Sequence, residues 1–267
     1  VSEKREVILE AKHVTRRFAA SHGRTLLANN DINLKMYKGE TLGLVGESGC
    51  GKSTFMRFLV SLDTPSEGEI LYRGTDITKL KGEELRNNRQ NIQMVFQDPY
   101  ASLDGRKSVF ESIAEPLIVQ KVYTQKADLE KRVYELMETA GLAKRLVNSY
   151  PHELDGGRRQ RVGIARALAL NPDFIVLDEP VSALDVSIQA QVLNLMEELQ
   201  QRFGLTYLFI SHDLSVVEMI SDRIGVMYKC QQQGIICPTA SPIYPGTVKR
   251  STDSIHRLSA GKDCVGG

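Results

Sequence analysis

The chain has 267 residues, of which 42% are hydrophobic and 25% charged, and its formal net charge is +1. These values are typical of a globular protein with one large domain, or with one core and a smaller inserted lobe. A net charge so close to zero excludes a bulk attraction to nucleic acid or to an anionic membrane, and the longest apolar runs, such as FIVL and YLFI, are too short to span a bilayer.

The first part of the chain is predicted to be rich in strands. Short stretches of alternating or uninterrupted apolar residues indicate strands at 7–13, 31–36, 41–46, 68–74 and 92–96. The first two strands are expected to be joined by a loop at 21–30. A glycine-rich turn follows the third strand and leads into an apolar helix at 53–62.

From about Lys107 to Ala169 the pattern becomes helical, and one helix, at 126–142, ends near a glycine that is typical of a helix stop. Buried strands return at 174–178, 206–212 and 223–228, and an amphipathic helix occupies 187–204. Strands that alternate with helices predict an α/β fold with a mostly parallel sheet covered on both faces, into which the helical segment is inserted. No element is predicted after Tyr228.

Residues 46–53 read GESGCGKS and fit the phosphate-loop pattern G-x-x-x-x-G-K-[ST], with a strand before them and a helix after them. In such a loop, backbone N–H groups and the dipole of the following helix hold phosphate oxygens. Lys52 would reach the β- and γ-phosphates, and the Ser53 hydroxyl would bind Mg²⁺. A glycine-rich turn with an exposed lysine is the alternative, which the flanking elements disfavour. The residues predicted to contact ATP in this segment are Gly46, Glu47, Ser48, Gly49, Cys50, Gly51, Lys52, Ser53 and Thr54.

Asp178 and Glu179 stand at the C-terminal end of the apolar strand FIVLD, the edge at which ligands bind in open α/β sheets. Asp178 would hold Mg²⁺ through water, and Glu179 is placed to polarise an attacking water. Two adjacent acids could instead cap a turn. With a phosphate loop upstream, a hydrolytic site is the favoured interpretation.

Four further motifs lie along the chain: VFQDP with Gln97, LDGGRRQR at 154–161, SALDVS with Asp185 and ISHD with His212. Together with the phosphate loop and the acidic pair, they make the chain resemble the nucleotide-binding subunits of ATP-binding cassette (ABC) transporters from about Val7 to Tyr228. The resemblance implies a P-loop NTPase core with a mostly parallel sheet, an antiparallel β subdomain and an inserted α-helical subdomain. It also implies that Gln97 contacts Mg²⁺ or the attacking water, that His212 contacts the γ-phosphate and that Asp185 lies at the seam of a dimer.

The same resemblance implies how the chain is divided. A single ATPase domain is expected at 1–228, with the core and β subdomain at about 1–106 and 170–228 and the helical subdomain at about 107–169, followed by an extension of uncertain structure at 229–267. Phe18, in TRRF, stands where the family stacks an aromatic ring on adenine. It could equally be an ordinary core residue.

Within the family, the segments GESGCGKST, IQMVFQDPYASL and SALDVSIQAQVLNLM are similar to the importer ATPases for dipeptides and oligopeptides, with nickel importers close by. This similarity implies a Mg²⁺-ATP hydrolase that drives peptide uptake from the cytoplasmic face of the cell membrane. Its expected partners are integral-membrane permease subunits, which contact the segment after Gln97, a second ABC ATPase subunit and, indirectly, an extracytoplasmic solute-binding protein. No nucleic acid is expected. Because the partners select the solute, the peptide assignment rests on analogy.

Family members usually have Leu-Ser-Gly-Gly-Gln at the signature, where this chain has Asp155, Gly156, Gly157 and Arg158 after a leucine. In the family's dimer, the signature of one subunit closes over ATP held by the other. Aspartate is a good helix N-cap, but two unit charges about 4 Å apart repel by roughly 4 kcal/mol at an effective dielectric constant of about 20. One interpretation is a heterodimer with unequal ATP sites; the other is a tolerated substitution with two working sites.

Two other classes of function compete with a hydrolytic importer subunit. A regulatory cassette that binds ATP without hydrolysing it is favoured by Asp155 and disfavoured by Glu179 and His212. A cassette acting on DNA is disfavoured because that class carries a long coiled-coil insertion, whereas about a hundred residues separate the phosphate loop from the signature here. The four cysteines, Cys50, Cys230, Cys237 and Cys264, have no C-x-x-C spacing and fit free thiols in the reducing cytosol.

Overall fold

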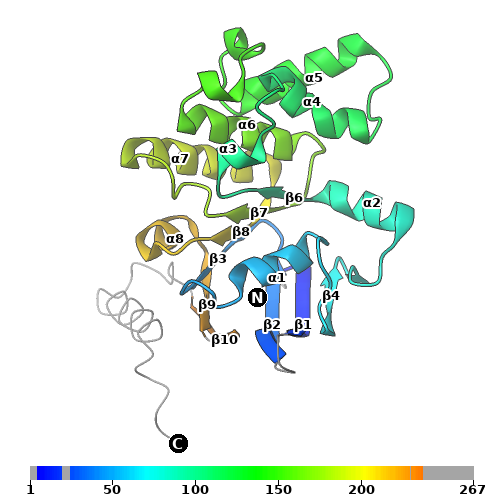
Figure 1. Ribbon diagram of the computed structural model, residues 1–267, viewed down its shortest axis with the longest axis vertical. Coiled ribbons are helices and arrows are strands. Elements are labelled where there is room, and N and C mark those ends of the chain that lie inside the picture. Colours follow the sequence, from blue (N-terminus) through cyan, green and yellow to red (C-terminus); the bar gives the residue numbers. More distant parts are fainter. Residues whose placement is uncertain (1–4, 20–24, 229, 237–267) are drawn as a thin grey trace, which may run out of the picture. The chain divides into compact units, whose positions relative to one another are not determined.

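The structure is a computed structural model that describes residues 5–19, 25–228 and 230–236 (Figure 1). The chain divides into two units: Val1–Arg89 with Thr206–Gly267 forms the first, and Gln90–Leu205 forms the second. Within the described residues, no helix combines the length and the apolar character needed to cross a membrane.

An antiparallel sheet makes up one part of the first unit. Its strand order is β2-β1-β4-β5, and the strands are β1 (Val7–Ala19), β2 (Thr25–Tyr37), β4 (Glu67–Tyr72) and β5 (Thr75–Asp76). Alternate side chains of the long strands, such as Leu9 and Leu34, are buried. The predicted loop at 21–30 is wrong from Thr25 onward, because these residues pair with the second half of β1 up to Ala19. Pairing to a neighbouring strand, which no local pattern reveals, extends β2 here.

Four further strands of the first unit run in the order β10-β9-β3-β8. They are β3 (Thr41–Gly46), β8 (Thr206–Ile210), β9 (Arg223–Tyr228) and β10 (Gln231–Ile236), with helices α1 (Lys52–Leu59) and α8 (Leu214–Ile220) in the same unit. Strand β3 pairs in parallel with both β8 and β9, and its uninterrupted burial explains its apolar sequence. Strand β10 returns antiparallel to β9, although the sequence pattern predicts no element there.

The second unit joins two parallel strands to a set of helices, seen in green and yellow in Figure 1. Its elements are β6 (Ile92–Val95), β7 (Phe174–Asp178), α3 (Pro99–Ser102), α4 (Val109–Val119), α5 (Lys126–Thr139), α6 (Gly156–Leu168) and α7 (Val186–Phe203), with short 3₁₀ turns at Lys144–Leu146 and Pro151–Glu153. Helix α4 begins with a capping box made by Ser108 and Glu111, and α7 ends at Gly204, whose φ of 65° is left-handed.

The sequence pattern does not predict helix α2 (Gly82–Asn91) or the short helices α3 and α8. Of these three, α2 is the longest. Its sequence, GEELRNNRQN, has almost no apolar face, and Asn88 is its only buried residue. The remaining architecture confirms the predicted fold class: parallel strands that alternate with helices, an antiparallel sheet and a helical segment inserted between β6 and β7.

A buried ion pair joins the start of β3 to β9 in the first unit. Glu40 is 4% exposed, and Arg223 Nη1 lies 2.9 Å from its Oε1 atom. The backbone N–H of Tyr37 donates to the same oxygen, at 2.8 Å. Burial raises the pKa of the Glu40 carboxyl, while the N–H of Tyr37 and the charge of Arg223 oppose the rise.

Replacing Arg223 by methionine is expected to lower the free energy of unfolding by about 3 kcal/mol at neutral pH, because the buried Glu40 carboxylate loses its cation. A carboxyl whose pKa is raised by folding stabilises the fold below its unfolded-state pKa, and this contribution is lost as pH rises through the folded-state pKa. The deficit should therefore shrink on acidification and grow toward neutral pH. Urea denaturation across this range measures it, with the Glu40→Gln/Arg223→Met double variant as control; a deficit of equal size in the double variant would contradict the explanation.

Candidate functional site

The phosphate loop of the first unit connects the buried strand β3 to α1. Gly49 and Gly51 have φ angles of 79° and 97°, in the left-handed region that favours glycine. Helix α1 begins at Lys52, one residue before the predicted start, and ends at Leu59, before the predicted end at residue 62. Ser61, two residues after the helix, has a left-handed φ of 55°. Lys52, Ser53 and Thr54 therefore all lie in the first turn of a helix, whose N–H groups favour an anion.

Lys52 is the charged group of this loop. It is only 8% exposed, and its Nζ donates to the carbonyl oxygens of Gly46, at 2.6 Å, and of Glu47, at 2.9 Å. The same ammonium lies 3.6 Å from Cys50 Sγ, and that side chain is 4% exposed. The lysine thus folds back over the loop carbonyls, so its predicted reach to phosphates requires these contacts to be exchanged for phosphate oxygens.

Asn29, a residue of β2, contacts the backbone of the phosphate loop. The sequence does not predict it as a site residue. Its side chain is fully buried in β2, and Asn29 Nδ2 donates to the Gly51 carbonyl at 3.1 Å. A Cβ atom on Gly51 would lie 2.1 Å from the Ala28 carbonyl oxygen. The hydrogen bond holds the turn at Gly51 against β2, and the absence of a side chain at Gly51 allows the two backbones to lie this close. A signal exists in the sequence: the polar run Asn29–Asp31 interrupts a strand whose next residues alternate.

The other two predicted residues of the first unit are placed as follows. His212 is exposed and follows β8, between Ser211 and Asp213, whose side chain caps α8 by accepting from the Ser215 N–H at 2.9 Å. Phe18 is half-buried on β1, and the Arg16 guanidinium lies over its ring at 4.6 Å from the centroid. Phe18 is therefore no fully buried core residue, and a flat cationic group already stacks on it.

In the second unit the structure brings Gln97 and Glu179 together. Gln97 Nε2 donates to Glu179 Oε2 at 2.9 Å. The register of the parallel strands explains the contact, because Val95 on β6 pairs with Leu177 on β7 and each partner stands two residues further on. Glu179 has a φ of 44°, and its carbonyl accepts from the Ser182 N–H and hydroxyl, so the residue is held in a tight turn. Asp178 is the last residue of β7.

Asp155 is the N-cap of α6, as its residue type predicts. Its Oδ1 atom accepts from the Arg158 backbone N–H at 2.7 Å, and its Oδ2 atom lies 3.4 Å from Arg158 Nε. The two side chains are half-exposed, at 51% and 47%. The carboxylate thus occupies the capping position in the way that a serine hydroxyl would, with a cation beside it.

The glycines behind Asp155 pack against the segment that contains Asp185. A Cβ on Gly156 would lie 3.0 Å from Leu184 Cδ2, and one on Gly157 would lie 2.5 Å from Ile188 Cγ2. Asp185 is the exposed N-cap residue of α7, and its carbonyl accepts from the N–H of Gln189 at 2.8 Å. Within this unit, the signature and the SALDVS motif therefore form one continuous surface.

Two arginines of α6 hold the segment that follows Gln97, and neither was singled out from the sequence. Arg166 Nη1 donates to the Ser102 carbonyl at 2.7 Å, and burial lowers the pKa of its guanidinium. Arg159 lies over the exposed ring of Tyr100, 4.8 Å from the centroid. Helix α3 is thereby tied at both ends to α6. The half-buried arginine on an otherwise apolar helix face is the sequence signal for such a role.

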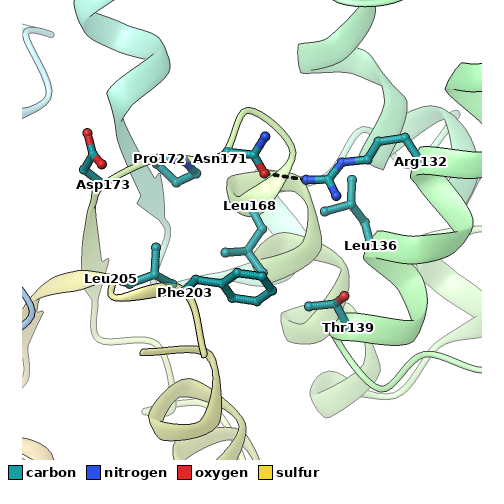
Figure 2. A pocket seen from close by; sticks show the side chains of 9 residues that line it. All are labelled: Arg132, Leu136, Thr139, Leu168, Asn171, Pro172, Asp173, Phe203 and Leu205. Atoms are coloured by element: carbon teal, nitrogen blue, oxygen red, sulfur yellow. Dashed lines mark hydrogen bonds between the residues drawn. The ribbon is translucent and has the colours of Figure 1, made fainter. Parts of the chain in front are cut away.

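The second unit also contains a cavity of about 150 Å³ between α5, the residues after α6 and the end of α7 (Figure 2). Leucine side chains line its apolar part, and at its rim Arg132 Nη2 donates to Asn171 Oδ1 at 2.6 Å. Its lining residues are Arg132, Leu136, Thr139, Leu168, Asn171, Pro172, Asp173, Phe203 and Leu205. None of the residues predicted to contact ATP or Mg²⁺ is among them.

The donor chemistry of the predicted residues fits Mg²⁺ and a nucleoside triphosphate. Among the residues predicted to bind Mg²⁺, Gln97 and Asp178 carry the oxygen ligands that this ion prefers, and Ser53 carries a hydroxyl. Glycines 46 and 51 let the loop pack closely on its neighbours, because a Cβ on Gly46 would lie 2.3 Å from the Met227 carbonyl oxygen and one on Gly51 would lie 2.1 Å from that of Ala28. A glycine-rich loop that leads into a helix N-terminus and a lysine is suited to phosphate oxygens.

Comparison with known proteins places these motifs in one family. The family model described as "ABC transporter" matches residues 29–182. The chain is 55% identical over 224 residues to the oligopeptide transport ATP-binding protein OppF of Bacillus subtilis, which covers 84% of this chain and 73% of the relative. It is 51% identical over 223 residues to the dipeptide transport ATP-binding protein DppF of Lactococcus lactis, with coverage of 83% and 72%.

Solved structures agree with the fold. The dimeric ATP-binding cassette MJ0796 in a post-hydrolysis state, bound to ADP and Pi, matches with a TM-score of 0.78 and 30% identity over 87% of this chain and 100% of that chain. CbiO1 from Clostridium perfringens, part of the ABC transporter complex CbiONQ, matches with a TM-score of 0.79 and 25% identity over 96% and 98%.

Proposed function

Because the chain belongs to the ABC transporter family, we propose that it is the ATP-binding and ATP-hydrolysing subunit of an importer for peptides. The observation that carries the proposal is the Gln97–Glu179 hydrogen bond, which holds a carboxylate and an amide together at the ends of two parallel strands. Relatives whose names describe oligopeptide and dipeptide transport support the solute class.

Phosphate binding is the task of the first unit. Residues Gly46 to Thr54 hold the triphosphate with loop N–H groups, the helix N-terminus and the Lys52 ammonium. Phe18 offers a half-buried ring for adenine, with Arg16 on its surface. His212 donates a ring N–H to a γ-phosphate oxygen, a role that its exposure allows.

Hydrolysis is the task of the second unit. Glu179 polarises the attacking water and takes its proton, while the Gln97 amide orients the carboxylate or the water. Ser53, Gln97 and Asp178 would hold Mg²⁺, which when bound neutralises charge on the β- and γ-phosphates. Asp155, Gly156, Gly157 and Asp185 would face a second ATPase subunit, since they form one surface of α6 and α7.

The partners follow from this assignment. We assign the chain to the cytoplasmic face of the cell membrane, bound to integral-membrane permease subunits through the segment after Gln97, where Tyr100 is 59% exposed. An extracytoplasmic solute-binding protein would deliver the peptide to the permease. The proposed division is an ATPase domain at 1–228 with a helical subdomain at about 107–169, supported by the position of α4, α5 and α6; Lys229 and residues 237–267 lie outside the described residues.

A heterodimer with a second ATPase subunit is proposed because Asp155 places a carboxylate where the partner's ATP would bind. Replacing Asp155 by serine preserves the helix cap and removes the charge, so Mg²⁺-ATPase turnover of the complex with its permease and second ATPase is expected to rise about two- to tenfold. The measurement is steady-state phosphate release, with Asp128→Ser, which exchanges another exposed aspartate at the start of a helix in the same unit, as a matched control.

Unchanged turnover for Asp155→Ser would show that the carboxylate is a harmless helix cap and that the two ATP sites are equal. The same experiment tests the proposed function. If the complex hydrolyses no ATP with either residue, and still binds it, the chain is a regulatory cassette, the alternative that Asp155 favours. Peptide-stimulated turnover with the solute-binding protein present supports the peptide class, and nickel-stimulated turnover contradicts it.

A further inference from the structure

Two cysteines of the first unit lie on neighbouring segments beside the phosphate loop. Cys50 lies in the loop and is buried, while Cys230 follows β9 and is half-buried. Both thiols are free. Because 180 residues separate the two positions in the chain, only the fold brings them together.

The strand register accounts for the approach on one side. Gly46, where the phosphate loop begins, pairs with Met227 near the end of β9. A Cβ on Gly46 would lie 2.7 Å from Cys50 Sγ and 2.3 Å from the Met227 carbonyl oxygen, so the sulfur and this oxygen are no farther apart than the sum of the two distances. Tyr228 then pairs with Gln231, which makes Cys230 part of the tight turn directly after β9.

Strand β2 contacts the two segments from the other side. The Asn30 N–H donates to the Cys230 carbonyl at 2.8 Å, and the neighbouring Asn29 donates to the carbonyl of Gly51, next to Cys50, at 3.1 Å. Burial and electrostatic repulsion from Cys50 raise the pKa of the Cys230 thiol. Cys230 itself has a φ of 66°, a left-handed conformation in which glycine would be unstrained.

We propose that Cys50 and Cys230 are a thiol pair that a low-molecular-weight disulfide oxidises to an intramolecular disulfide, closing the phosphate loop to ATP. The more exposed Cys230 thiolate attacks the small disulfide, forming a mixed disulfide and releasing one thiol. Cys50 then attacks the Cys230 sulfur, and the second small thiol leaves with the proton. Two protein thiols are oxidised, and the small disulfide is reduced to two thiols.

The bond would act on nucleotide binding through the loop backbone. Cys50 is flanked by Gly49 and Gly51, and its side chain packs against Gly46. Pulling its sulfur toward Cys230 turns the loop N–H groups away from the phosphate position and displaces the Lys52 ammonium, which lies 3.6 Å from that sulfur. This inference rests on the proposed binding of ATP by the same loop. Bound ATP, which orders the loop, should conversely slow the oxidation.

The test uses the full chain with Cys237 and Cys264 replaced by serine, so that two thiols remain. ATP affinity is first measured with reductant by fluorescence of a labelled ATP; absence of binding there would refute the proposed function rather than this inference. The protein is then treated with glutathione disulfide at about pH 8.5, where thiolates form. We expect both thiols to be lost, a Cys50–Cys230 peptide in the mass spectrum, and about a tenfold or greater loss of affinity that reductant reverses.

The Cys230→Gly variant is the matched control, because glycine fits the left-handed backbone at this position. It should bind ATP like the parent chain and keep its affinity after the same treatment. The inference is overturned if both thiols remain titratable, if Cys230 stops at the mixed disulfide with glutathione, or if the intramolecular bond forms without change in ATP affinity. Protection of the pair by ATP would support it further.

Discussion

Replacing Glu179 by glutamine is expected to lower Mg²⁺-ATPase turnover by roughly 10²–10⁴-fold while leaving ATP binding unchanged. The substitution keeps the shape of the side chain, and its amide oxygen can still accept the hydrogen bond that Gln97 Nε2 donates at 2.9 Å. What is lost is the ability to take a proton from water. The φ of 44° at this residue is retained, so the turn after β7 should persist.

Steady-state phosphate release by the complex, together with equilibrium binding of labelled ATP, separates the two effects. Glu197→Gln is the control, because it makes the same chemical change at an exposed position of α7, where the carboxylate accepts a hydrogen bond from Gln201 Nε2 at 3.3 Å. Turnover of the Glu179 variant within twofold of the parent chain would mean that another group activates the water.

A second large effect is expected for Gly51→Ala, which should lower ATP affinity by about 10²-fold and destabilise the first unit. The glycine has a φ of 97°, and the added methyl would lie 2.1 Å from the Ala28 carbonyl oxygen and 2.7 Å from Asn29 Nδ2. No side-chain rotation relieves a contact with backbone, so the loop must move away from β2. The backbone N–H groups of the loop would then no longer point toward the phosphates.

Gly49→Ala provides the matched comparison for this experiment. Gly49 has a similar φ of 79°, but nothing lies within 4 Å of its Cβ position. Only the cost of a left-handed alanine, about 1 kcal/mol, applies there. Thermal unfolding and labelled-ATP binding should therefore rank the parent chain first, the Gly49 variant second and the Gly51 variant last. Equal losses in the two variants would assign the effect to backbone strain alone.

The parts of the site that follow from strand ends could be predicted from the sequence. Asp178 and Glu179 end one buried apolar strand and Gln97 follows another, and parallel pairing of Val95 with Leu177 brings Gln97 and Glu179 to the same edge. The phosphate loop is equally local, because its glycines, lysine and flanking elements are contiguous in the chain.

Other features depend on pairing between distant segments and leave little local trace. Residues 25–30 form a strand only because β1 is there to pair with them, and β10 forms along β9 from a glutamine-rich sequence. Asn29 belongs to the site because its side chain donates a hydrogen bond to the Gly51 carbonyl. The sequence around Asn29 does not predict this contact. Helix α2 is polar on all sides, so apolar periodicity cannot find it.

The packing behind the signature limits how this surface can change during evolution. A side chain at Gly157 would collide with Ile188, and one at Gly156 would press on Leu184. The capping position, by contrast, is half-exposed at Asp155 and tolerates any short side chain that accepts a hydrogen bond. A mutation at this one position can therefore change the charge on the exposed start of α6 without repacking the helix, whereas the two glycines behind it cannot vary in this way.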